Sequence, residues 1–568
     1  MIATNALAGQ SLALRLATWL ERLCGLLVGV LLAGLLGVVL AAVAARYLFG
    51  SSIVGAEELA LWLHVALVFA GLPLVSNGAL AMRLDILAGR LGRRGQLACE
   101  IFGDAVVVHA CLVFLFGART VIEEIGGVST VLGAPEGWRF VPVLFGAGAA
   151  VLLGWLRAWG HGRAIAGTLA LLLGIGLYLV ASFSAFEPLA RPSVLAGGFA
   201  LFALLIGAPL PHSLIAAASL AIPFGALLPE AAIVQNSVAG IGRFLLLAIP
   251  FFLLAGALMT AGGLAERLVA LAATLVGHRR GGMAQTTLVT NLMISGMSGS
   301  SIADAAFGAK VLAPALVQSG YRPERAAAIV AATSILPNIV PPSIAFLILA
   351  AATDLSVGSL FAGGLAAGFL ICLALALALY LLSGSVPGGA KAGQGARRKA
   401  LLRAMPVIGL ALVILFGIRF GVVTTTEAAG LAALYALLVA LFIRRGAGAG
   451  TLAATFAEAG REAAAVGLLI GTAAPFVFML AVDGLPRLVV DLFAGVSEPL
   501  AVLLLANLVL LVADERASME QAIAAGAEIV QPADRQEWVE SARTVWDAFA
   551  DQLGGMQRIK AIRAEAAP

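Results

Sequence analysis

Five residues in one short stretch rich in glycine and serine carry the groups best suited to binding a small cation. They are Ser298, Gly299, Ser300, Ser301 and Asp304. Glycine allows a helix to break, and the carbonyl groups freed at such a break join hydroxyl and carboxylate oxygens as ligands for a small cation. The sequence therefore predicts a cation site at Ser298, Ser300, Ser301 and Asp304, with Gly299 in the break.

The residues around this stretch favour a binding role for it. Residues 295–310 lie within sequence that is otherwise almost entirely apolar. A carboxylate such as Asp304 inside a membrane segment costs several kcal/mol unless it meets a partner, which makes function the default interpretation. The alternative is close helix packing, because small residues in membrane helices also permit tight crossings.

A second interruption contains two adjacent prolines, Pro341 and Pro342, followed by Ser343. Adjacent prolines cannot continue an α-helix, since both backbone donors are missing and the rings clash with the preceding turn. Interrupted apolar segments indicate a binding site near the membrane midplane, so these three residues join the candidate substrate and ion site. Further interruptions are predicted at residues 207–211 and 248–256.

Composition fixes the class of protein. Of the 568 residues, 61% are hydrophobic and 12% are charged, whereas soluble domains are about half apolar. Apolar runs of about twenty residues recur along the chain and predict an all-α polytopic membrane protein in contact with the lipid bilayer. The net charge of +4 lies in short loops, which indicates topology rather than nucleic-acid binding. The four scattered cysteines favour neither a disulfide framework nor a metal site, and we expect no organic cofactor.

Charged connectors predict the orientation of the chain. The basic connector 82–94 is expected to lie in the cytoplasm, as a helix along the membrane surface, and the acidic connector 119–139 outside. The basic linker 383–403 is also expected inside. Beyond it, the threonines at 424–426 and Glu427 predict a helix cap rather than an ion site.

The order of several motifs resembles the membrane subunits of TRAP transporters. Residues 193–512 are similar to the large subunit, and residues 1–165 to the small four-helix subunit, with a connecting helix and linker at 166–192. The motifs that carry the resemblance are Ala-Ile-Pro-Phe-Phe-Leu-Leu-Ala-Gly, Ser-Gly-Met-Ser-Gly-Ser-Ser-Ile-Ala-Asp, Gly-Tyr, Pro-Pro-Ser-Ile and Thr-Thr-Thr-Glu-Ala in the large part, and Arg46-Tyr47, Glu57-Glu58 and the basic connector in the small part.

The resemblance implies a transporter and not an enzyme. It implies a multi-pass protein of the bacterial inner membrane, with a re-entrant helical hairpin, broken helices and an elevator-type architecture. It further implies sodium-coupled uptake of a carboxylate-bearing solute, a small organic acid, that a periplasmic binding protein delivers. The hairpin would contain Ser298, Gly299, Ser300, Ser301 and Asp304 and would contribute to sodium and substrate binding, with sodium at Ser298, Ser300, Ser301 and Asp304. The break at Pro341, Pro342 and Ser343 would face it.

The end of the sequence departs from the family pattern. Residues 513–568 are charged and resemble the closing helix of a TRAP periplasmic binding protein, where the family has a second hairpin, so we expect the second half of the transport site to be incomplete. A non-transporting truncated relic and an independent sodium-coupled carrier are the alternatives. Gly296-Met297-Ser298-Gly299 matches a motif of intramembrane serine proteases, but no histidine follows His278 to act as the general base.

Overall fold

The computed structural model describes residues 12–76, 79–84, 87–186, 191–353, 355–382, 386, 388–443 and 449–487. The chain divides into Met1–Leu492 and Phe493–Pro568, and the second unit, with the expected tail 513–568, lies outside the described residues. The described residues contain no β-strand, and ten of their helices are long and apolar enough to cross a membrane. The expected all-α polytopic fold is confirmed.

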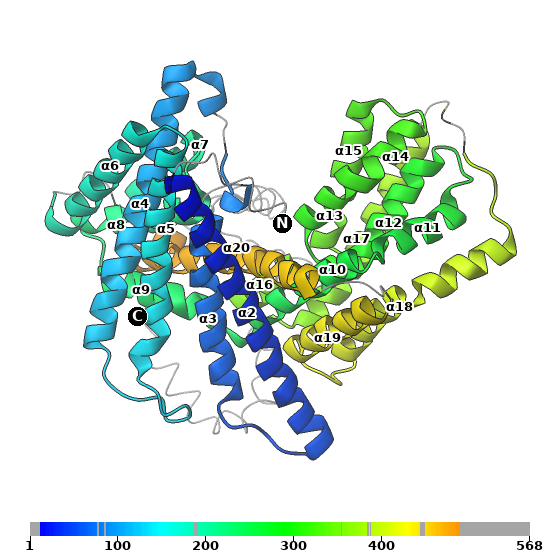
Figure 1. The fold of residues 1–568 in the computed structure, drawn as a ribbon, viewed down its shortest axis with the longest axis horizontal. Coiled ribbons are helices and arrows are strands. Elements are labelled where there is room, and N and C mark those ends of the chain that lie inside the picture. The colour runs from blue at the N-terminus through cyan, green and yellow to red at the C-terminus, as the bar shows by residue number, and fades with distance from the viewer. Residues whose placement is uncertain are drawn as a thin grey trace, which may run out of the picture. The chain divides into compact units, whose positions relative to one another are not determined.

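Long apolar helices form the N-terminal third of the chain (Figure 1). Each of the five is long enough to span the hydrocarbon core of a bilayer, which needs about twenty residues. Short 3₁₀ turns separate some of them. The elements are α2 (Leu12–Phe49), α3 (Ala56–Val75), η1 (Ala79–Ala81), η2 (Ala88–Arg90), α4 (Arg93–Glu124), η3 (Glu136–Phe140), α5 (Val141–Gly160) and α6 (Ala164–Phe183).

The basic connector does not form the surface helix that its sequence predicts. Its described residues before α4 contain only the short turn η2. The backbone is instead bonded to the next part of the chain, since Leu87 N donates to Leu205 O at 3.2 Å and Leu210 N donates to Met82 O at 3.3 Å. The expected helix is wrong because these long-range hydrogen bonds replace the local ones.

Between residues 192 and 261 the structure contains one of the two predicted helix breaks and lacks the other. The elements of this part are α7 (Pro192–Ile206), α8 (Leu210–Leu220), η4 (Ile222–Phe224), α9 (Glu230–Ile241), η5 (Phe244–Leu247) and α10 (Ala248–Ala261). The break predicted at 207–211 is present between α7 and α8. The break predicted at 248–256 is wrong, because those residues form the start of α10. Pro250 lies in the first turn, where its missing N–H removes no helical hydrogen bond.

Shorter elements follow and carry the predicted site. They are α11 (Ala265–Val276), α12 (Gly282–Ser298), α13 (Ser301–Phe307), a π-helical turn η6 (Gly308–Leu312), α14 (Ala313–Gln318), α15 (Pro323–Thr333), η7 (Leu336–Asn338), α16 (Ile344–Thr353) and α17 (Val357–Leu382). α13 and α14 fold back on α12, and α15 and α17 also pack against it. Buried side chains from α12, α14, α15 and α17 form a second, smaller hydrophobic cluster, and Ile294 of α12 and Phe361 of α17 also belong to the larger one.

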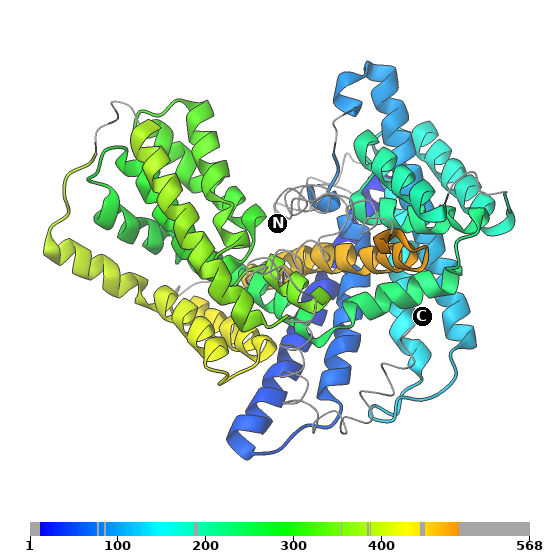
Figure 2. The same cartoon turned by 180° about the vertical axis from the view of Figure 1, so that it is seen from behind.

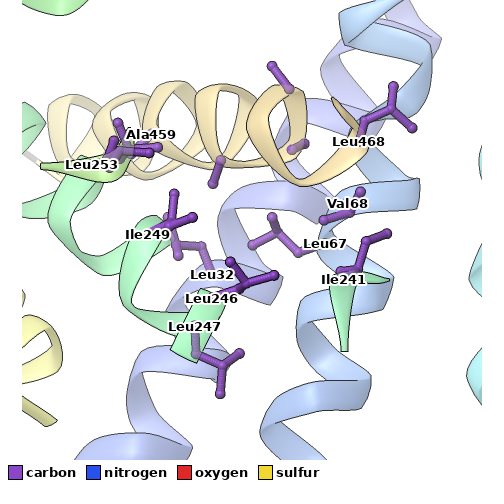
Figure 3. Close-up of a cluster of buried hydrophobic side chains, with 14 of the residues drawn as sticks. Leu32, Leu67, Val68, Ile241, Leu246, Leu247, Ile249, Leu253, Ala459 and Leu468 are labelled. Carbon is purple, nitrogen blue, oxygen red and sulfur yellow. The ribbon is translucent and has the colours of Figure 1, made fainter. Parts of the chain in front are cut away.

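The largest core lies where helices from both ends of the described chain meet. The last helices are α18 (Gln394–Arg419), α19 (Thr425–Ile443) and α20 (Ala449–Val482). α20 crosses α2 and α3 in both views (Figures 1 and 2). At the crossing, buried residues of α2, α3, η5, α10 and α20 interdigitate, among them Leu32, Leu67, Leu246, Ile249 and Leu468 (Figure 3). The N-terminal helices and α20 therefore share one core.

A glycine in α3 lets α20 approach closely. A Cβ atom added at Gly71 would lie 2.3 Å from Cβ of Ala464 in α20. Real Cβ atoms do not approach so closely, and Ala464 has little freedom to move because its side chain is rigid and buried. The crossing of α3 and α20 therefore depends on the absence of a side chain at this position.

We expect Gly71→Val to loosen this crossing. Overpacking of a close-packed contact costs about 1–3 kcal/mol. The apparent melting temperature of the purified protein in detergent should fall, as measured by the reactivity of its buried cysteines with a fluorescent thiol probe. Gly34→Val on α2 is the matched control, because an added Cβ there meets nothing within 4 Å. Equal melting temperatures for the two variants would contradict the proposed contact.

A buried carboxylate joins α2 to the start of α19. Glu427 accepts hydrogen bonds from Arg46 Nη1 at 2.8 Å, from Tyr47 Oη at 3.3 Å and from Thr424 N at 2.8 Å. Glu427 N in turn donates to Thr424 Oγ1 at 3.3 Å, so these two residues form the predicted helix cap. The side chain of Glu427 is only 7% exposed, and its ion pair with Arg46 links residues 381 positions apart.

Candidate functional site

The predicted break in the glycine- and serine-rich stretch occurs at Gly299. α12 ends at Ser298, and α13 begins at Ser301. Gly299 has a φ of 57°, in the left-handed region that residues with a Cβ atom rarely adopt. The chain therefore leaves one helix and enters another within two residues, and helix termini of this kind carry backbone groups without an intrahelical partner.

The break at Gly299 lies directly against the double proline. A Cβ atom added at Gly299 would be 2.6 Å from Pro342 O, and one added at Gly296 would be 4.0 Å from Pro341 O. Both prolines and Gly299 are buried. The structure thus brings together the two interruptions that the sequence singled out, and it leaves no room for a side chain between them.

Ser343 has a local role at the second interruption. Its hydroxyl donates to Asn338 O at 2.6 Å and accepts from Phe346 N at 3.3 Å, in the manner of a cap at the start of α16. Since the hydroxyl of Ser343 is engaged on both sides, the groups that this segment offers to a ligand are its backbone carbonyls. The freed carbonyls of a broken helix are suitable ligands for a cation.

Asp304 is buried within the first turn of α13. The residue is 1% exposed, and its backbone N donates to Ser300 O at 3.1 Å. Ser300 and Ser301 are half-buried, one turn before it. Ser298 ends α12 beside them, and its side chain lies outside what the structure describes. The predicted ion-binding residues therefore gather at one junction of two helices, around a buried carboxylate.

Buried polar side chains on α12 and α15 extend the site beyond the predicted residues. Asn291 Nδ2 donates to Thr333 Oγ1 at 2.7 Å, and Ser295 Oγ donates to Asn291 O at 2.6 Å. Asn291 and Thr333 are fully buried. Asn291, Ser295 and Ser298 are spaced by four and then three residues, which places them on one face of α12. This spacing could have identified Asn291 from the sequence.

We expect Thr333→Val to destabilise the protein, because it leaves a buried amide donor of Asn291 without its acceptor. An unsatisfied buried donor costs about 1–3 kcal/mol. Thermal unfolding in detergent measures the loss, and adding Asn291→Leu should recover much of it, since removing both partners is nearly neutral. Thr353→Val is the matched control, because that hydroxyl donates to Leu349 O on its own helix. Equal losses for Thr333→Val and Thr353→Val would contradict the interaction.

The models of two protein families match successive parts of the chain. Residues 197–536 match the model of the tripartite ATP-independent periplasmic transporter, DctM component. Residues 35–164 match the model of the tripartite ATP-independent periplasmic transporters, DctQ component. The two matches follow one another along a single chain, and the predicted site residues, Arg46 and Glu427 all fall within them.

Relatives with established names support the same assignment. The chain is 31% identical over 470 residues to the isethionate TRAP transporter permease protein DctMQ of Oleidesulfovibrio alaskensis, covering 80% of this chain and 73% of the relative. It is 28% identical over 505 residues to the sialic acid TRAP transporter permease protein SiaT of Haemophilus influenzae, covering 85% and 82%. It is 35% identical over 260 residues to the 2,3-diketo-L-gulonate TRAP transporter large permease protein YiaN of Escherichia coli, covering 45% and 61%.

These matches, with ten helices able to cross a membrane in the part of the chain that the structure describes, establish the class of protein. Permeases of this kind are transporters and not enzymes, and they work with a periplasmic solute-binding protein. The chain is a multi-pass protein of the bacterial inner membrane and belongs to the TRAP transporter permease family, with the small and large membrane components fused in one polypeptide.

Proposed function

We propose that the chain takes up a small carboxylate-bearing solute by sodium symport, after a periplasmic binding protein delivers the solute. The meeting of two helix breaks beside a buried carboxylate is the observation that carries the proposal. Gly299 packs on Pro342, and Asp304 is buried in the first turn after the break. Interrupted helices of this kind hold the substrate and coupling-ion sites of secondary transporters.

Electrostatics explains why a sodium ion would be needed. Two anions near each other in a low-dielectric site repel strongly, so the carboxylate of Asp304 disfavours an anionic solute. A bound Na⁺ held by Asp304, the oxygens of Ser298, Ser300 and Ser301, and the carbonyls at Pro341, Pro342 and Ser343 would offset that charge. Binding of the ion and binding of the solute would then favour each other, which is the requirement for coupling.

The surrounding architecture is compatible with an elevator movement, which we include in the proposal. α12, α14, α15 and α17 contribute most of a smaller hydrophobic cluster, and α2, α3, α10 and α20 contribute to the larger core, which Ile294 of α12 and Phe361 of α17 also join. The first set would carry the site, and the second would serve as the scaffold. Relatives are named for sialic acid, 2,3-diketo-L-gulonate and C4-dicarboxylates, which bear carboxylates, and for isethionate, which bears a sulfonate instead. The carboxylates are the solutes to test first, and isethionate is the organic anion that tests the need for a carboxylate.

Uptake in proteoliposomes tests the proposal. The full chain is reconstituted, a sodium gradient is imposed, and uptake of each radiolabelled organic anion is measured with and without the matching binding protein. We expect uptake that requires both the gradient and the binding protein. Uptake without the binding protein would identify an independent carrier, and no uptake of any solute under any gradient would contradict transport by this chain.

A further inference from the structure

A cavity of about 570 Å³ lies between α4, α5 and α6, away from the site described above. Its volume is within the range of about 300–1,000 Å³ that is typical of ligand pockets. The three helices pack against one another in the part of the chain that matches the small component and in the helix that follows it (Figure 1). The two breaks of the transport site contribute none of the residues that line this cavity.

The lining of this cavity divides into two chemically different halves. One half is apolar, and its residues are Val107, Val108, Ala150, Val151 and Leu171. The other half is polar and aromatic, and its residues are Glu100, Asp104, Trp155, Arg157, His161 and Arg163. A ligand that fills this space must therefore have both a hydrocarbon part and a charged part.

The charged half lies at the level of the lipid headgroups. Arg157 lies in the last turn of α5, and His161 and Arg163 belong to the short basic connector between α5 and α6, which the positive-inside rule places in the cytoplasm. Trp155 and Trp159 pack together near the end of α5, with ring centroids 5.2 Å apart, as is typical of a membrane interface. The apolar half then extends to the depth of the hydrocarbon core.

The two arginines retain hydrogen-bond donors for a phosphate group. Arg157 Nε donates to Glu21 Oε1 at 2.7 Å, and Arg163 Nη1 donates to Glu100 Oε2 at 2.7 Å. A guanidinium group has five N–H donors, and within the described residues each of these two engages a carboxylate through one nitrogen. The remaining donors have the geometry that binds phosphate oxygens.

The balance of charge in the cavity selects among phospholipids. Arg157 and Arg163 contribute two positive charges to the lining, and Glu100 and Asp104 contribute two negative charges. Within the protein, Glu100 is paired with Arg163 at 2.7 Å, Asp104 with Arg83 at 3.4 Å and Arg157 with Glu21 at 2.7 Å, so these charges are balanced. An anionic headgroup would add an unbalanced negative charge, whereas a headgroup that joins its phosphate to an ammonium group adds no net charge. An ammonium with N–H donors can in addition hydrogen-bond to a carboxylate, which a quaternary ammonium cannot do.

We infer that this cavity is a binding site for one phosphatidylethanolamine molecule from the cytoplasmic leaflet. An acyl chain occupies the apolar half between α4, α5 and α6. The phosphate binds Arg157 and Arg163, and the ammonium binds Glu100 and Asp104. The lipid thereby fills the space between the small component and α6, the helix that leads to the large component.

Native mass spectrometry of the full chain tests this site. The protein is incorporated into nanodiscs of phosphatidylethanolamine, phosphatidylcholine or phosphatidylglycerol, extracted into detergent, and examined for retained lipid. We expect one phosphatidylethanolamine to be retained, with phosphatidylcholine and phosphatidylglycerol retained about tenfold less, the effect of losing one or two charge-assisted hydrogen bonds. Inorganic phosphate should not displace the lipid. Equal retention of all three lipids, or displacement by phosphate, would overturn the inference.

Two substitutions test the location of the lipid. Ala166→Phe fills the cavity from α6, and Arg163→Gln removes a phosphate ligand. Each should reduce retention of phosphatidylethanolamine about tenfold. Leu172→Phe on the same helix, which is 60% exposed and does not line the cavity, and Arg119→Gln, whose residue forms a similar ion pair with Glu123, are the matched controls. Size-exclusion chromatography confirms folding, and equal retention by variants and controls would place the lipid elsewhere.

Discussion

Asp304→Asn is expected to reduce sodium-dependent uptake by about 100-fold or more. Asparagine keeps the size of the side chain and removes its charge, so a bound Na⁺ would lose its only carboxylate among the proposed ligands. Breaking a buried pair of opposite charges costs about 3–5 kcal/mol, and 1.4 kcal/mol corresponds to a factor of ten. Initial uptake rates in proteoliposomes at several sodium concentrations measure the effect.

Ser300→Ala removes a neutral ligand and should have a smaller effect on the same measurement. We expect the sodium concentration for half-maximal uptake to rise about tenfold, since a hydroxyl ligand contributes about 1–2 kcal/mol. Glu123→Gln and Ser319→Ala are the matched controls, because both residues are exposed and distant in sequence from the breaks. Uptake and sodium dependence that remain unchanged in both Asp304→Asn and Ser300→Ala would refute the proposed ion site.

Gly299→Ala is the second substitution with a large expected effect. It requires a left-handed backbone with a Cβ atom and places that atom 2.6 Å from Pro342 O. The strain costs about 1–3 kcal/mol, and the steric contact forces the two breaks apart. We expect uptake to fall by about 100-fold while most of the protein still folds, because a displacement of about 1 Å is enough to spoil a binding site.

Gly320→Ala separates the effect of backbone strain from the effect of the steric contact with Pro342. Gly320 has a φ of 98°, but an added Cβ there meets nothing within 4 Å. This control therefore carries backbone strain without the contact. We expect it to lower the melting temperature and to leave most of the uptake. If Gly320→Ala and Gly299→Ala reduced uptake equally, the contact between Gly299 and Pro342 would have no functional role.

Local sequence signals predicted those parts of the structure that depend on local chemistry. The double proline at Pro341 and Pro342 cannot continue a helix in any environment, and the break is present. Thr424 and Glu427 have the spacing of a capping pair, and their side chains and backbone bond reciprocally. The break predicted at residues 248–256 is wrong because Pro250 lies in the first turn of α10, where a proline favours the start of a helix instead of interrupting it.

The sequence contains no local signal that predicts the contacts between distant parts of the chain. The approach of Gly299 to Pro342 depends on how α12 and α16 pack, and nothing in the glycine-rich stretch specifies its partner. Asn291 lies outside the glycine- and serine-rich stretch and was not predicted as a site residue, although its helical spacing places it on the face of Ser295 and Ser298. The partner of Glu427 was also unpredictable, since Arg46 precedes it by 381 residues.

The separation of 381 residues between Arg46 and Glu427 has a consequence for how the protein is synthesised and inserted into the membrane. Ribosomes add about 5–20 residues per second, so roughly 20 to 80 seconds pass between the synthesis of Arg46 and that of Glu427. During this interval Arg46 has no Glu427 to bind, yet its side chain is 51% exposed even in the finished protein, and water or lipid phosphates at the outer surface can solvate it. Glu427 is buried and enters a site whose arginine is already in place. Because Arg46 precedes Glu427 along the chain, the acidic side chain of Glu427 does not have to enter the membrane before its basic partner is present.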